Sequence, residues 1–226
     1  EINNESPIFG DISLPSIEEL KIRAINHYAA QSRAVTRQDY IAMLYRMPAK
    51  FGAIKRAQIF QDKDSFKRSL NLYVVSENFD GTLVATNDSL KRNVRLWLSR
   101  YKMMNDTINI LDAKIINLKI SFKIMTNVVG SEKYQVLDKA IAVLKSKMLD
   151  IMPEIGEPFL ITDVYSILKD VDGVLDVIDV SVDNNWGGLY SDYGYDTKRN
   201  LSSDGRMLAV PSDAIWEIKY VDDDIK

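Results

Sequence analysis

The clearest pattern along the chain is an alternation of apolar and polar residues between positions 116 and 124. Apolar side chains occupy the even positions, and the odd positions carry Asn117, Lys119, Ser121 and Lys123. Because successive side chains of a strand point to opposite faces, this pattern predicts a strand with one buried face and one solvated face. Such a strand favours an antiparallel sheet covered on one side. Shorter patterns predict strands near residues 57–61, 70–77, 174–182 and 216–220.

Apolar residues spaced by three or four positions predict helices elsewhere in the chain. The first helix has Ser16 as its cap and an apolar stripe made of Ile17, Leu20, Ala24 and Tyr28. Further helices are predicted over 87–103, from Ser131 to the residues before Pro153, and from a Thr162 cap to residue 168. The apolar face of the long helix is predicted to consist of Tyr134, Leu137, Ile141, Leu144 and Met148.

These elements predict an α+β protein with two small subdomains, at residues 1–127 and 128–226. We expect each to be an antiparallel or mixed sheet with helices packed on one face. The segment Asn127–Ser131, with Gly130 as its pivot, is the predicted boundary.

The segment 33–60 contains the most complete set of local signals for secondary structure. Thr36 and Asp39 have the spacing of a capping box, and Val35 and Tyr40 have the spacing of a hydrophobic staple. Pro48 ends the apolar periodicity that follows. The pattern therefore predicts a short helix followed by a strand.

The same segment, Arg-Ala-Val-Thr-x-x-Asp-Tyr with its short helix, proline and strand, resembles the signature of the baseplate J-like family. A second block over 137–182 is also similar: a long helix, Ile-Gly-Glu-Pro with Gly156, a short helix, and Val-Asp-Gly-Val-Leu-Asp-Val with Gly173. The two blocks span residues 17–182. Within the family, the chain resembles the wedge subunits of T-even phages most.

The resemblance implies a structural role in the baseplate of a contractile phage tail. Family members of this kind form dimers, bind other wedge proteins and link neighbouring wedges into a ring around the hub. That ring rearranges when the sheath contracts. The resemblance also implies location in the virion tail baseplate after assembly in the host cytoplasm. Since the chain begins with Glu1, we expect a C-terminal fragment of a longer protein or a processed chain.

Composition narrows the classes of function. The chain has 226 residues, a formal net charge of −3 and no cysteine, which excludes disulfides, thiolate zinc sites and cysteine nucleophiles. No apolar run approaches the length of a membrane span, so we expect none. The weakly acidic balance does not favour a general polyanion binder, although a local basic patch remains open.

No catalytic constellation emerges from the sequence. His27 is the single histidine, and no Gly-x-Ser-x-Gly elbow accompanies it. Asp170, Asp172 and Asp176 are arranged superficially like a calcium loop, but the EF-hand pattern fails at three positions. That segment predicts a helix-to-strand turn, and Gly173 suits a left-handed position after the helix. We expect no enzyme activity, metal or cofactor, and a solvated acidic end at 222–224.

Two surface features leave alternatives open. The window 91–102 contains five cations and no acid, interleaved with Trp97 and Tyr101. Three interpretations of this basic window remain. It is the solvated face of a helix whose aromatic residues face the core, a surface for an acidic partner, or a surface for nucleic acid.

The second feature is a Gly- and Tyr-rich loop over 186–203. Its apolar and aromatic residues are candidates for a protein interface, since Trp and Tyr are common in such contacts. Packing on their own domain and carbohydrate binding remain alternatives. The candidate residues are Trp186, Leu189, Tyr190, Tyr193 and Tyr195.

Overall fold

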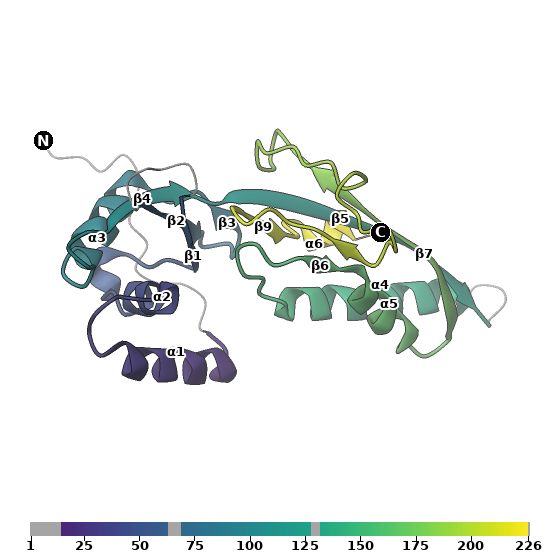
Figure 1. Ribbon diagram of the computed structural model, residues 1–226. Helices are drawn as coiled ribbons and strands as arrows, with labels where there is room; N and C mark the ends of the chain where they lie inside the picture. Colours follow the sequence, from purple (N-terminus) through teal and green to yellow (C-terminus); the bar gives the residue numbers. More distant parts are fainter. Residues whose placement is uncertain (1–14, 63–68, 128–131, 226) are drawn as a thin grey trace, which may run out of the picture. The chain divides into compact units, whose positions relative to one another are not determined.

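The computed structural model describes residues 15–62, 69–127 and 132–225. Its contacts divide the chain into two compact units, 1–113 and 114–226. Helices and small antiparallel or mixed sheets occur in both, which confirms the predicted α+β class (Figure 1). The boundary predicted after residue 127 falls inside the second unit, between a strand and the helix that follows it. Ser131 and Gly130, the predicted cap and pivot, lie outside the described residues.

Over residues 15–62 and 69–113, unit 1 combines a four-stranded sheet with three α-helices. Strand β2 is antiparallel to β1 and β3 and parallel to β4. The buried core lies between this sheet and helices α2 and α3, and includes Met43, Leu72 and Leu98. Its elements are α1 (Ile17–Ala30), α2 (Arg37–Tyr45), the 3-10 turn η1 (Ala49–Phe51), β1 (Arg56–Gln61), β2 (Ser69–Glu77), β3 (Leu83–Val84), α3 (Asp88–Leu98) and β4 (Thr107–Asp112).

Unit 2 is organised around one long strand. β5 pairs antiparallel with β7 and parallel with β9, and helices α4 and α5 share its core. These partners all come from the C-terminal half, which is why β5 belongs to unit 2. Its elements are β5 (Lys114–Thr126), α4 (Glu132–Asp150), β6 (Phe159–Leu160), α5 (Ile161–Lys169), β7 (Val174–Asn185), β8 (Met207–Leu208), β9 (Ala214–Glu217) and α6 (Val221–Asp224).

The strand predicted from alternation is confirmed as β5, but its polar face is not uniformly wet. Asn117 is 1% exposed, because its amide donates to Glu217 Oε2 and its carbonyl accepts from the Ser191 N–H. The loop after β7 therefore covers the polar face near this residue.

Several helix predictions need correction. α3 ends at Leu98, before the predicted 103, and α5 begins at Ile161, so Thr162 lies inside that helix and is not its cap. In α4 the buried positions follow a strict four-residue spacing, and the predicted Tyr134 is 59% exposed. The buried face of α4 consists of Val136, Ala140, Leu144 and Met148.

The C-terminal end also differs from its prediction. β9 stops at Glu217, and the acidic segment forms α6. Asp224 is 1% exposed and accepts hydrogen bonds from Asn185, the Tyr190 hydroxyl and the Tyr220 N–H. A buried carboxylate needs such donors, and this set overturns the expectation of a solvated end at Asp224.

Candidate assembly surfaces

The signature residues of the first block build the start of α2. Thr36 caps the helix: its Oγ1 accepts from the Asp39 N–H at 3.2 Å, and Asp39 Oδ2 accepts from the Thr36 N–H at 2.8 Å. The predicted capping box is therefore confirmed. Burial by itself would raise the pKa of the Asp39 carboxyl. Hydrogen bonds from the Thr36 and Val35 N–H groups outweigh it and hold that pKa below its ordinary value. Tyr40 is buried, whereas Val35 is 55% exposed, so the predicted staple does not bury it.

Tyr40 and the two signature glycines also have local structural roles. The Tyr40 hydroxyl donates to Asp106 Oδ2 at 2.6 Å, and burial together with this bond raises its pKa. Gly156 has φ +83° and its N–H donates to the Ala214 carbonyl. Gly173 has φ +97° and lies in the turn between α5 and β7, a left-handed position after the helix. A Cβ there would lie 2.9 Å from a Val136 methyl.

Helix α1 holds to unit 1 by its charged side. Glu19 Oε1 accepts from Arg23 at 2.5 Å and from the buried Arg56 at 3.0 Å. The Arg23 guanidinium also lies over the Tyr45 ring, 4.1 Å from its centroid. Glu19, Arg23 and the buried Ala30 recur at intervals of a helical turn, so they form the inner face of α1.

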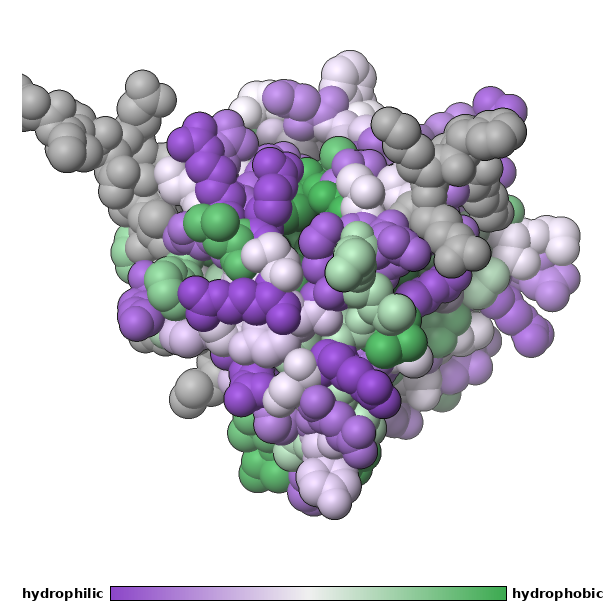
Figure 2. All heavy atoms as spheres, turned by 60° about the vertical axis from the view of Figure 1, so that its left-hand side comes forward, coloured by the Kyte–Doolittle hydropathy of each residue, from purple (hydrophilic) through white to green (hydrophobic). Residues whose placement is uncertain are grey.

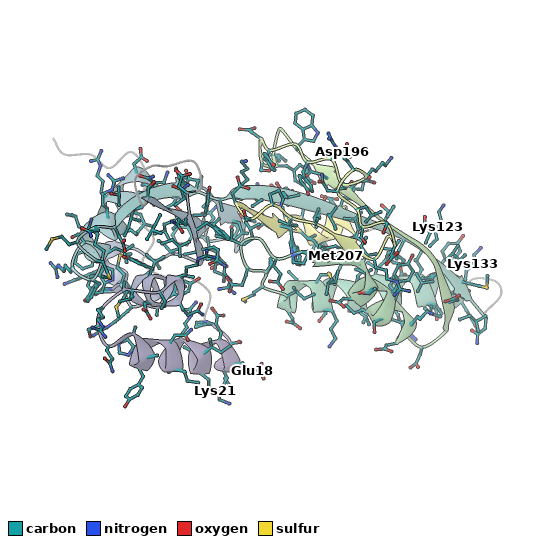
Figure 3. All side chains as sticks on the ribbon, viewed as in Figure 1. Glu18, Lys21, Lys123, Lys133, Asp196 and Met207 are labelled. Atoms are coloured by element: carbon teal, nitrogen blue, oxygen red, sulfur yellow. The ribbon has the colours of Figure 1, made fainter. Side chains whose placement is uncertain are left out.

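The opposite side of α1 is largely apolar and exposed, with the charged Glu18 and Lys21 among its apolar residues. We call it the outer face of α1; besides Ala24, it consists of Ile17 (73% exposed), Leu20 (50%), Ile22 (57%), Ile25 (68%) and Tyr28 (87%). Figure 2 shows hydrophobic side chains among hydrophilic ones at the lower end of the view, where α1 lies. Figure 3 shows Glu18 and Lys21 on the lower, outward side of the helix. A surface helix normally turns its apolar stripe inward. This reversal makes the outer face of α1 a candidate interaction surface, because large exposed apolar patches are uncommon on monomers.

The aromatic loop of unit 2 separates into two parts. Tyr190 donates to Asp224 Oδ1 at 2.8 Å and meets the Tyr220 ring edge-on; burial, followed by the Asp224 contact, raises its pKa. Tyr193 and Tyr195 are stacked, and both pack on the core of unit 2. The Tyr195 hydroxyl donates to the Ala209 carbonyl, and burial raises its pKa. These three tyrosines pack on their own unit.

Trp186 and Leu189 remain outside that packing. Trp186 is 67% exposed and Leu189 is 75% exposed. The backbone around them is fixed, since Gly187 N–H donates to the Ser191 carbonyl and Lys219 donates to the Leu189 carbonyl. Of the five residues predicted from sequence, these two form an exposed apolar tip on an anchored loop.

The remaining sequence candidates occupy ordinary positions. His27 is exposed on α1, and Asp170 to Gly173 connect α5 to β7, which confirms the predicted turn. Among the described residues, no group of three or more His, Asp or Glu side chains is placed to hold a metal ion. Over the same residues, no helix has the length and apolarity needed to cross a membrane.

Comparison with solved structures gives a likeness in fold. No family model matches the sequence, and no curated protein matches it. The structure is similar to a chain in the cryo-EM structure of the anti-feeding prophage (AFP) baseplate, with a TM-score of 0.50 and 17% identity over 75% of this chain. The two chains share a fold. The match covers 38% of the baseplate chain, so this chain corresponds to a part of that protein.

Proposed function

We propose that this chain is a structural part of a contractile-tail baseplate. The observation that carries the proposal is the fold shared with a chain of the AFP baseplate. Because one fold can host many functions, the surfaces must supply the rest of the argument. An assembly protein needs self-complementary or partner-complementary apolar surfaces. The outer face of α1 and the Trp186–Leu189 tip supply them.

Within this role, we assign the chain to the baseplate J-like family as a wedge component. It associates with itself and with other wedge proteins, and it links neighbouring wedges into a ring that rearranges on sheath contraction. It is assembled in the host cytoplasm into the virion tail baseplate. The support is the segment with Thr36 and Asp39, together with the block containing Gly156 and Gly173. The Trp186–Leu189 tip and the outer face of α1 are the contact surfaces in this proposal.

No observation favours the alternative functions. Sugar-binding aromatic rings must present an open face, whereas Tyr190, Tyr193 and Tyr195 pack on unit 2, and of the five loop candidates Trp186 alone presents an exposed ring. In the basic window, Trp97 and Tyr101 pack on the core of unit 1, as predicted, so they offer no platform on which nucleic-acid bases stack. We assign the chain no enzymatic activity, metal or cofactor.

Charging the outer face of α1 is expected to weaken self-association. In the L20K/I25K variant two lysines replace exposed apolar side chains, and lysine preserves helix propensity. Burying those ammonium groups in a contact should weaken association by about tenfold or more. Sedimentation velocity over a concentration series measures this directly, and W186S/L189S tests the loop tip in the same way.

The matched control is V143K/L149K, which places the same charges on exposed apolar positions of α4. It should associate like the wild type. A wild type that stays monomeric at every concentration and in mixtures with wedge proteins would contradict the proposal. If L20K/I25K associates as strongly as the wild type, the outer face of α1 is not a contact surface.

A further inference from the structure

The outer side of α3 carries a small hollow with a basic rim. The hollow has a volume of about 130 Å³ and is lined by Phe51, Asn93, Leu96, Trp97 and Arg100. Its walls are fixed, because the Trp97 indole donates to the Met43 carbonyl at 2.7 Å and the Asn93 amide donates to the Phe51 carbonyl at 2.9 Å. Leu96 is 69% exposed at its edge. The hollow therefore offers a preformed apolar seat for one side chain.

The cations around this hollow divide into two groups. Lys91 binds Asp112 at 2.7 Å, and Lys102 donates to the Asp106 carbonyl at 2.7 Å. Arg92, Arg95 and Arg100 are exposed and make no ion pair with any residue that the structure describes. Arg92 and Arg95 lie on the same side of α3 as Leu96. We call this surface, with the hollow, the basic hollow of unit 1.

Unit 2 carries a surface of opposite charge. Segment 170–183 contains five aspartates and no lysine or arginine. Its strand, β7, lies at the edge of the β7–β5–β9 sheet. Asp176 binds Lys169, and Asp179 and Asp183 lie opposite Lys123 and Lys119 in the register with β5. Asp170 and Asp172 are exposed and make no ion pair with any residue that the structure describes.

Two apolar side chains project from this acidic edge. The register with β5 shifts twice, and residues 175 and 178 have no partner in it. These extra residues are Leu175 and Ile178, which are 60% and 61% exposed. Bulges of this kind turn an additional side chain out of the sheet and disrupt the edge for ordinary strand pairing. We call 170–179 the acidic edge of β7.

We propose that the basic hollow of unit 1 binds the acidic edge of β7 from a second copy of this chain. Leu175 or Ile178 fills the hollow, and Asp170 and Asp172 face the unpaired arginines. Since the two surfaces differ, the contact is head-to-tail, and such contacts generate rings or open filaments. This deepens the proposed function and rests on it for the self-association of the chain.

Charge reversal tests both sides of the contact at once. R92E/R95E places acids on α3 beside the hollow, and D170K/D172K places cations on the edge. Each variant alone should associate about tenfold or more weakly than the wild type, because like charges then face one another. A one-to-one mixture should recover association, since each altered surface now finds an opposite charge on the other variant. Sedimentation velocity of the two variants and their mixture measures this.

The control is K139E/K147E, which reverses two exposed lysines on α4 and should leave association unchanged. A mixture that stays dissociated overturns the proposal, as do single variants that associate like the wild type. The proposal also fails if R92E/R95E loses binding to a single-stranded DNA probe but keeps self-association. The charge-reversal variants and their mixture are measured again with the L20K/I25K substitutions present in every chain. This comparison separates the contact of the basic hollow from the contact of the outer face of α1. If the mixture fails to recover association but L20K/I25K still weakens it, the contact of the basic hollow is rejected. If the mixture recovers association but L20K/I25K does not weaken it, the contact of α1 is rejected.

Discussion

Replacing Glu77 by Gln is expected to lower the free energy of unfolding of unit 1 by about 3–5 kcal/mol. Glu77 accepts from the Lys55 ammonium at 3.1 and 3.2 Å, and each side chain is 8% exposed. The substitution nearly preserves shape but removes the carboxylate charge that faces the buried Lys55 ammonium. Chemical denaturation followed by circular dichroism measures the loss.

The paired variant K55M/E77L provides the control for this prediction. Replacing both charges by apolar groups of similar size removes the buried charge together with its partner, so the double variant should be far more stable than E77Q. A double variant that is as unstable as E77Q would show that packing, and not the uncompensated charge, sets the cost.

Replacing Leu118 by Ala is expected to destabilise unit 2 by about 2–5 kcal/mol. Leu118 is fully buried on β5, in a core that it shares with Leu144 of α4 and Leu168 of α5. Removing its branched end leaves a cavity at the centre of a close-packed region, which the surrounding helices and strands can fill only in part. Thermal or urea unfolding with a probe in unit 2 measures the change.

The neighbouring Lys123→Ala variant is the matched control. Lys123 lies on the same strand but is exposed, so its truncation should cost less than about 1 kcal/mol. Equal effects of the two variants would mean that β5 does not form the centre of this core.

The sequence predicted the elements well where a local rule dominates. The alternation at 116–124 predicted β5, and the Thr36–Asp39 spacing predicted the cap of α2. Both depend on residues close in the chain. The partners of β5 were beyond prediction, because β7 and β9 lie far along the chain and no local pattern specifies which strands pair.

The surfaces were harder to predict than the elements. Periodicity identified the apolar stripe with Ile17 and Leu20, but it could not show which side of α1 packs against the rest of unit 1. That side is decided by Glu19, whose partner Arg56 lies on β1. In the same way, nothing in the local sequence shows that Asp224 receives the Tyr190 hydroxyl. For α1, one signal in the sequence could have identified the inner face: Glu19 and Arg23 lie one helical turn apart, on the side opposite most of the apolar stripe.

The central claim is that the outer face of α1 is covered in the associated protein. The chain has no cysteine, so Ala24→Cys introduces a single thiol in the middle of that face without a large change in size. Thiol-labelling rates should be high in dilute protein and fall several-fold as the chain associates, whereas a Lys147→Cys control on α4 should label at one rate throughout. Labelling of the position-24 thiol that stays equally fast in fully associated protein would contradict the account.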